Sequence, residues 1–184
     1  NVTGVVHPVE QMIAMIRKQS DAIIVLDAAQ SLPHGRLNLH TLGADFVAFS
    51  AHKMLGPTGL GFLYANRHRL DSLKPLQFGG GTVDWVDTDG QISRRAPYHL
   101  EAGTPAIASV IGAGASFRLL AGFDETALRA HDRNLVNSLL SGAASRPYLK
   151  LIGPSDGENR HAIGAFKFSD CVSVGEIARL LSDA

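Results

Sequence analysis

Two charged side chains lie directly after apolar runs, which is where an active site is expected in an α/β protein. Asp27 follows residues 22–26, and Lys53 comes shortly after residues 46–49. Apolar runs of this length are typical of buried strands. Ligands of open α/β sheets bind beyond the carboxyl ends of the strands. The sequence therefore places a carboxylate and an amine at what could be one edge of a sheet.

That pair suits one kind of covalent chemistry. A lysine amine in a dry pocket favours its neutral form and can form a Schiff base with a carbonyl. A carboxylate can keep a pyridine nitrogen protonated, so that the ring of pyridoxal phosphate acts as an electron sink. Ser50 and His52, beside the lysine, are suitable donors to a phosphate. The alternatives are that Lys53 is a solvated loop charge and that Asp27 only caps a turn.

Composition excludes several classes of function. The 184 residues carry no net charge and only 18% charged residues, so no basic field is available for nucleic acid. No apolar stretch reaches the ~18 residues that would suggest a membrane span. The one cysteine, Cys171, cannot form an internal disulfide and fits a cytoplasmic setting. A hydrophobic content of 45% supports a real core.

The elements that would position these residues follow an α/β pattern. Residues 8–20 predict a helix, and residues 22–26 predict a central parallel strand buried on both faces. The runs on either side of Lys53 predict the next two strands. Residues 74–103 show little periodicity, and a stretch of this kind usually carries function or an interface.

The second half of the chain is predicted to be mainly helical at first. Thr104 as N-cap and Pro105 at the first helical position predict a helix to about residue 121, and Asp124 predicts another to about 144. Strands are expected at 149–152 and 163–168. Ser173 and Glu176 predict a capping box before a last helix. A composition shift near Gly122 divides the chain into domains 1–122 and 123–184.

Three motifs together resemble the class V aminotransferase family, and are most similar to cysteine desulfurases and selenocysteine lyases. They are Leu-Asp-Ala-Ala-Gln at 26–30, Phe-Ser-Ala-His-Lys-Met-Leu-Gly-Pro-Thr-Gly at 49–59, and Glu-Ala-Gly-Thr-Pro at 101–105. The resemblance implies part of the pyridoxal-phosphate-dependent, aspartate aminotransferase-like α/β fold. That fold has a mostly parallel sheet with flanking helices. Residues 1–122 would belong to the large cofactor-binding domain, and 123–184 to a small C-terminal domain.

The resemblance also implies roles for the residues around the cofactor ring. Lys53 would form the Schiff base, and Asp27 would pair with the pyridinium nitrogen. Gln30 would bond the phenolic oxygen, and Ala29 would pack on the ring face.

The remaining implied roles concern the phosphate, the substrate and the partner subunit. Ser50 and His52 would hold the phosphate. Thr104 would reach the phosphate bound by the other subunit of a homodimer. Asn1 would meet the substrate carboxylate, whereas His34 is expected to be structural.

The resemblance further implies a longer parent protein. Residues that stack on the ring are expected before Asn1, and a substrate-binding arginine and a nucleophilic cysteine are expected after Ala184. Cys171 has the wrong motif context for that nucleophile and is interpreted as a small, semi-buried residue. The implied reaction converts cysteine to alanine, with sulfur passed to an enzyme thiol and possible delivery to an acceptor protein. The alternatives are a selenocysteine lyase, an aminotransferase, an epimerase or a non-catalytic remnant of the fold.

Overall fold

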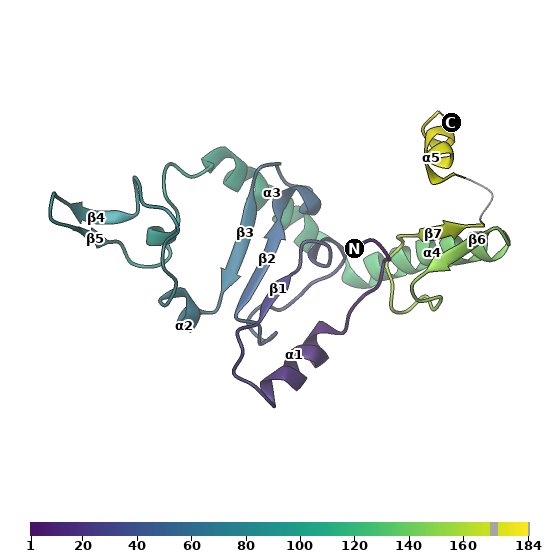
Figure 1. The fold of residues 1–184 in the computed structure, drawn as a ribbon, viewed down its shortest axis with the longest axis horizontal. Helices are drawn as coiled ribbons and strands as arrows, with labels where there is room; N and C mark the ends of the chain where they lie inside the picture. Colours follow the sequence, from purple (N-terminus) through teal and green to yellow (C-terminus); the bar gives the residue numbers. More distant parts are fainter. Residues whose placement is uncertain (170–172, 184) are drawn as a thin grey trace. The chain divides into compact units, whose positions relative to one another are not determined.

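The computed structural model describes residues 1–169 and 173–183, so the interpretation of Cys171 lies outside the described residues. The chain forms two compact units, which are coloured along the sequence in Figure 1. The first unit spans Val9–Phe123, and the second combines Asn1–Pro8 with Asp124–Ala184. The units change between Phe123 and Asp124, next to the predicted boundary at Gly122. The first eight residues, however, group with the second unit. The assignment of these units to a large and a small domain stays a prediction.

A three-stranded sheet forms the centre of the first unit. Its strands are β1 (Val25–Asp27), β2 (Phe46–Ser50) and β3 (Gly61–Ala65), in the order β1-β2-β3. β1 runs parallel to β2, whereas β3 runs antiparallel to β2, so this sheet is mixed rather than mostly parallel. The connection between β1 and β2 is long enough for a parallel crossover, and the short connection from β2 to β3 forces an antiparallel pair.

The core of the first unit lies on β2 and the segments before it. Val47 and Ala28 are fully buried and pack with Ile13 of α1 (Val9–Arg17). The prediction that the first strand is buried on both faces is wrong for the described residues. β1 begins at Val25, pairs only with β2, and leaves the Val25 side chain 65% exposed. An apolar run predicts a strand, but burial depends on neighbours that a run does not specify.

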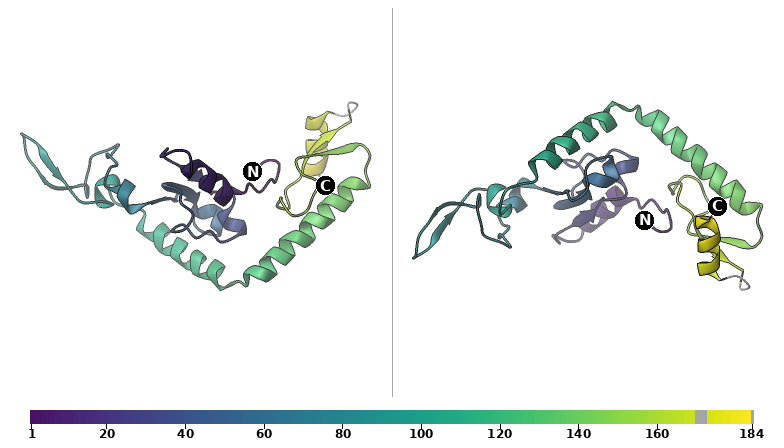
Figure 2. Two further views of the ribbon diagram at one scale, coloured as in Figure 1. Left: turned by 90° about the horizontal axis from the view of Figure 1, so that it is seen from below. Right: turned by 90° about the horizontal axis from the view of Figure 1, so that it is seen from above.

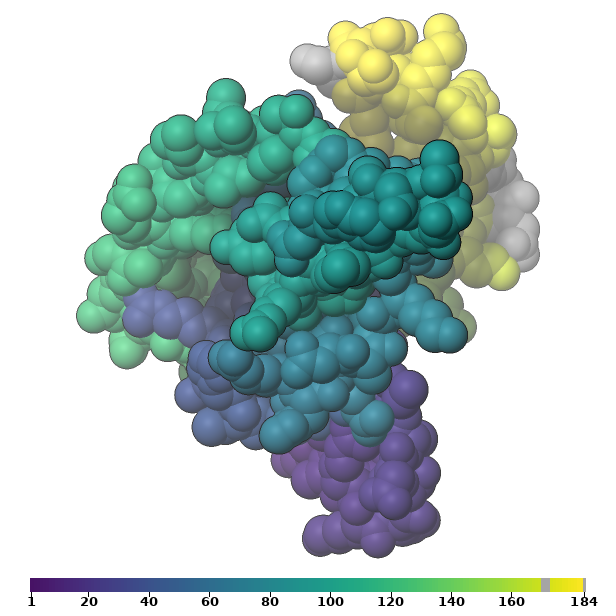
Figure 3. All heavy atoms as spheres, turned by 90° about the vertical axis from the view of Figure 1, so that its left-hand side faces the viewer, coloured from purple at the N-terminus to yellow at the C-terminus, as the bar shows by residue number. Residues whose placement is uncertain are grey.

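The stretch predicted to be aperiodic contains a β-hairpin. β4 (Val83–Val86) pairs antiparallel with β5 (Gln91–Ser93), and Asp87 forms the turn by accepting hydrogen bonds from the backbone N–H groups of Asp89 and Gly90. Figure 3 faces the side of the molecule on which this teal segment lies in the foreground. The two strands were missed because they are only four and three residues long.

Short turns and one long helix complete the first unit. The helical turns are η1 (Leu32–His34), η2 (Ala51–Met54), α2 (Arg67–Leu70) and η3 (Tyr98–Leu100). The long helix α3 (Ile107–Gly122) begins three residues after its predicted N-cap, so the prediction that Thr104 caps it is wrong. Thr104 lies in a bend and Pro105 lies outside any helix or strand, whereas Ala106 is the N-cap, without a side-chain hydrogen bond. Figure 2 shows α3 running beside the sheet.

The second unit packs a helix with a two-stranded sheet. Asp124 caps α4 (Glu125–Ala144) by accepting a hydrogen bond from the Ala127 N–H, which confirms the predicted cap. β6 (Leu149–Ile152) pairs antiparallel with β7 (Ala165–Phe168). The last helix, α5 (Val174–Ser182), follows Ser173 as predicted. The predicted capping box is wrong in one respect, because the Ser173 side chain makes no capping hydrogen bond.

A buried arginine ties the N-terminal residues into the second unit. Arg160 is 3% exposed and donates to the carbonyls of Thr3, Pro154 and Ile163. Val5 also forms an isolated bridge with Arg160. Residues 1–8 therefore belong structurally with a segment more than a hundred residues away in the sequence.

No single helix within residues 1–169 and 173–183 is long and apolar enough to cross a membrane. α3 and α4 meet the requirements of length and apolar composition only as a pair, and that pair is broken between Gly122 and Glu125.

Candidate active site

The structure places Asp27 and Lys53 after neighbouring parallel strands. Asp27 ends β1 and is in register with Ala48 of β2, and Lys53 lies in the η2 turn directly after β2. The turns that follow the two strands, η1 and η2, contact each other. The prediction that both residues lie at one edge of a sheet is therefore confirmed.

Neither charged group is neutralised within the part of the chain that the structure describes. The Asp27 side chain is exposed, and its Oδ1 accepts one hydrogen bond from the Ala29 N–H at 2.9 Å. The Lys53 side chain is half-buried and has no hydrogen bond or ion pair with a described residue. Charged groups that are partly withdrawn from water are usually paired. An open carboxylate and an open amine at one edge fit a cofactor that offers both a ring nitrogen and an aldehyde.

The backbone around Lys53 is tightly constrained. Ala51, at the start of the turn, is fully buried, and its N–H donates to the Leu60 carbonyl at 3.0 Å. At the other end Leu55 has a left-handed backbone with φ of 59°, and the Gly56 N–H donates to the Ala51 carbonyl at 2.9 Å. A Cβ on Gly56 would lie 2.8 Å from that carbonyl oxygen, so only glycine fits there.

The other predicted cofactor residues of the first unit lie at or near the same strand ends. Ala29 and Gln30 are half-buried and follow β1, and the N–H of the intervening Ala28 donates to the Ala48 carbonyl at 2.8 Å. Ser50 ends β2 and is half-buried, whereas His52 is exposed in the η2 turn. The positions agree with a shared site at these strand ends, and the binding of a phosphate by Ser50 and His52 stays a prediction.

Thr104 and Asn1 lie outside the turns that follow β1 and β2. Thr104 is exposed and follows Gly103, whose N–H donates to the Gly80 carbonyl at 2.9 Å. That bond fixes Thr104 beside the glycine-rich loop at residues 79–81. Asn1 is exposed and belongs to the second unit. Both assignments stay predictions.

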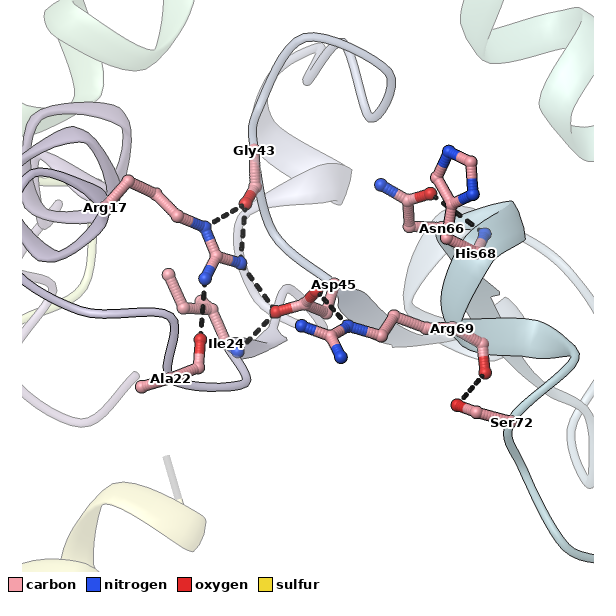
Figure 4. A network of polar contacts seen from close by, with 9 residues as sticks. All are labelled: Arg17, Ala22, Ile24, Gly43, Asp45, Asn66, His68, Arg69 and Ser72. Atoms are coloured by element: carbon pink, nitrogen blue, oxygen red, sulfur yellow. Dashed lines mark hydrogen bonds and ion pairs between the residues drawn. The ribbon is translucent and has the colours of Figure 1, made fainter.

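Sequence reasoning missed a charged network at the other end of β2. Asp45, just before β2, is 6% exposed and accepts hydrogen bonds from the Ile24 N–H, Arg17 and Arg69 (Figure 4). The Ile24 N–H holds the pKa of the Asp45 carboxyl well below its usual range. The two arginines lower it further, against burial, which raises it. An aspartate before an apolar strand carries no sequence signal for such a network, because the arginines lie 28 residues before it and 24 after it.

Sequence reasoning also missed Ser116 of α3. Its Oγ lies 3.0 Å from the carbonyl oxygen of Leu55, two residues after Lys53. One turn earlier in α3, Gly112 lies close to Pro57, which follows the Lys53 turn. No pattern in the sequence singled out the hydroxyl.

Comparison with known proteins gives the same family throughout. The profile of the family described as aminotransferase class V matches residues 1–184. A probable cysteine desulfurase 2 of Mycobacterium leprae is 41% identical over the whole chain, and a probable cysteine desulfurase of Pasteurella multocida is 40% identical. The chain spans 43% and 42% of these two relatives, which is less than half of their length.

Solved structures of similar proteins confirm the fold. The apo cysteine desulfurase of Thermococcus onnurineus superimposes with a TM-score of 0.88 at 31% identity, covering 100% of this chain and 45% of that one. The Escherichia coli cysteine desulfurase CsdA gives a TM-score of 0.88 at 32% identity, covering 99% and 44%. The chain therefore forms a part of the α/β fold that was predicted.

Proposed function

Because the chain belongs to the class V aminotransferase family, we propose that it is the part of a pyridoxal-phosphate-dependent enzyme that carries the cofactor-binding lysine. The observation that carries this proposal is the location of Asp27 and Lys53 at the same ends of two neighbouring parallel strands, each without a neutralising partner among the described residues. In a structural ion pair the charged groups would bond to each other, as Asp45 does with Arg17 and Arg69.

Within the proposed site, each residue has a separate task. Lys53 would attach the cofactor covalently, and Asp27 would hold a proton on the ring nitrogen. Gln30, Ala29, Ser50 and His52 would orient the ring and phosphate. Pyridoxal phosphate, once bound, would supply an electron sink for a carbanion next to the amino group. The rigid turn from Ala51 to Gly56 fits this task, because a reactive amine must be held in place.

The proposed substrate is cysteine, and the proposed products are alanine and sulfur bound to an enzyme thiol. In this reaction the carbon–sulfur bond breaks, the sulfur moves to the thiol, and a proton replaces it on carbon. The proposal draws on the relatives that are named as probable cysteine desulfurases. An acceptor protein for the sulfur and a cytoplasmic location belong to the same proposal, as does Asn1 as a contact of the substrate carboxylate.

The test uses the full-length protein with pyridoxal phosphate. Borohydride reduction should fix the cofactor to the peptide that contains Lys53, as read by mass spectrometry. Addition of cysteine should release alanine in proportion to the sulfur transferred. A fixed cofactor without alanine formation would retain the cofactor role and reject the desulfurase reaction. Absence of any fixed cofactor would reject both.

The proposal includes a homodimer in which Thr104 serves the cofactor of the partner subunit. Loss of one charge-assisted hydrogen bond in Thr104→Ala should weaken cofactor binding by ~1.5–3 kcal/mol. Mixing Thr104→Ala with Lys53→Ala creates hybrid dimers with one doubly defective site and one intact site. Activity at limiting cofactor should therefore return on mixing. If subunits exchange and no activity returns, the shared site is rejected.

A further inference from the structure

Helix α3 contacts the segment that follows Lys53 at two points. The Ser116 hydroxyl lies 3.0 Å from the Leu55 carbonyl oxygen and 3.1 Å from the Gly112 carbonyl oxygen of its own helix, so its proton is shared between them. One turn earlier, a Cβ on Gly112 would lie 2.9 Å from Cγ of Pro57. Residues four apart share a face of a helix, so one face of α3 meets both Leu55 and Pro57.

The conformation of Leu55 needs this support. Its φ of 59° makes it the one non-glycine residue with a left-handed backbone in the described chain. Side chains other than glycine adopt this region at a cost in free energy, because Cβ approaches the following carbonyl. The Leu55 side chain is 65% exposed, so burial contributes little to holding it there. Within the turn, the N–H groups of Leu55 and Gly56 both donate to the Ala51 carbonyl. From outside the turn, Ser116 adds a hydrogen bond to the Leu55 carbonyl itself.

The helix itself is fixed to the strand that leads to Lys53. Phe117, next to Ser116, contacts Phe49 of β2 and Phe62 of β3, with ring centroids 6.4 and 5.3 Å apart. The Lys53 turn is therefore held at its start by buried Ala51, which directly follows β2. After its end it is held by Ser116, whose helix packs on β2 through Phe117.

We propose that Ser116 is a positioning residue for Lys53, which acts by fixing the left-handed conformation of Leu55. The inference rests on the proposed function, since it assumes that Lys53 attaches the cofactor. Ser116 touches neither cofactor nor substrate in this proposal. Ser116 fixes the position of the end of the turn, and thereby the position of the Lys53 amine.

The first test is Ser116→Ala in the full-length protein. Labelling of Lys53 is measured by titration with pyridoxal phosphate, borohydride reduction and peptide mass mapping. Half-maximal labelling should need about three- to ten-fold more cofactor, the equivalent of one neutral hydrogen bond. The melting temperature of the cofactor-free protein should fall only slightly, because the better helix propensity of alanine offsets part of the lost hydrogen bond. Ser141→Ala is the matched control, since Ser141 is a helical serine that bonds the Ser138 carbonyl in α4.

A second pair of variants tests the steric contact. Gly112→Ala should displace Pro57 and lower labelling more than Ser116→Ala does. Gly114→Ala on the same helix is the control, because its Cβ would meet nothing closer than an Arg118 side-chain nitrogen at 3.6 Å.

Leu55→Gly separates positioning from general stability. Glycine adopts a positive φ without strain, so the double variant Ser116→Ala/Leu55→Gly should recover part of the lost labelling. Unchanged labelling in Ser116→Ala would overturn the inference. So would a loss of labelling that tracks the melting temperature and is not recovered by Leu55→Gly. Absence of label at Lys53 in the unmodified protein would instead overturn the proposed function.

Discussion

The charged groups at the two ends of strand β2 differ in how they are bonded. Before the strand, the buried carboxylate of Asp45 is bonded by Arg17, Arg69 and the Ile24 N–H. After the strand, Lys53 has no such partner in the described chain, and neither does the Asp27 carboxylate beyond the Ala29 N–H of its own turn.

The difference distinguishes a structural charge from a chemical one. A buried carboxylate costs free energy unless it is fully bonded, and the Asp45 end meets that demand with groups from its own chain. At the other end, the exposed Asp27 carboxylate and the half-buried Lys53 amine can be solvated by water instead of being bonded by the described chain, so a ligand can replace that water. The same strand thus has a closed end, which stabilises the fold, and an open end, where a ligand can bind.

The largest expected effect is at the open end, in Lys53→Ala. Because no other amine can replace the covalent linkage, borohydride should fix no cofactor to the peptide that contains residue 53. Thermal unfolding of the cofactor-free protein should change little, since Lys53 makes no bond to lose. Lys18→Ala, at an exposed lysine after α1, is the control and should retain full labelling. Cofactor fixed to the same peptide in Lys53→Ala would contradict the assignment.

Asp27→Asn is expected to give the next largest effect. Asparagine keeps an oxygen for the Ala29 N–H, so the turn and cofactor attachment should survive. Turnover should fall by about 10²-fold, the size of loss found for other electrostatic contacts in transition states. Steady-state kinetics of alanine formation measures it, with Asp21→Asn at an exposed aspartate as control. Normal turnover would mean that Asp27 serves only its turn.

Much of the open end could be predicted from the sequence, because it is local. Asp27 and Lys53 each follow an apolar run directly, and the parallel pairing of the runs then brings them to one edge. The closed end could not be predicted, because its partners are far apart in the chain. The contact of Ser116 with Leu55 was missed for the same reason, since it joins residues 61 positions apart.

The errors in the fold have similar causes. Thr104-Pro105 has the composition of a helix start, yet α3 begins at Ile107, after Ala106 with its non-helical backbone. Val25 lies in an apolar run but is exposed, because exposure depends on neighbouring segments. Local patterns predicted the elements, and tertiary contacts decided their ends and burial.

Asp45→Asn should weaken the fold without affecting the open end. Loss of charge-assisted bonds should lower the free energy of unfolding at neutral pH by about 2 kcal/mol. The folded-state pKa of Asp45 is lowered, so its stabilisation is fully present above the unfolded value of 3.8 and is lost progressively as pH falls from there through the lower folded-state pKa. The difference in unfolding free energy between the two proteins should therefore begin to shrink below about pH 4. Denaturant unfolding from pH 7 to pH 3 measures this, with Asp21→Asn as the control. A constant difference across that range would show that the charge is not what matters.

The smallest effect is expected from Arg69→Met, which removes one of the two arginines at the closed end. Arg69 contributes a single bond to Asp45, of 2.8 Å, and its side chain is 38% exposed. Arg17 also bonds the carbonyls of Ala22 and Gly43, so it should be the stronger support. Arg69→Met should therefore cost about 1 kcal/mol of unfolding free energy, and Arg17→Met more. Arg67→Met, an exposed position on the same helix, is the matched control and should be nearly silent. Equal losses from Arg67→Met and Arg69→Met in denaturant unfolding would show that the ion pair with Asp45 adds nothing. The closed end would then rest on the Ile24 N–H and Arg17 alone.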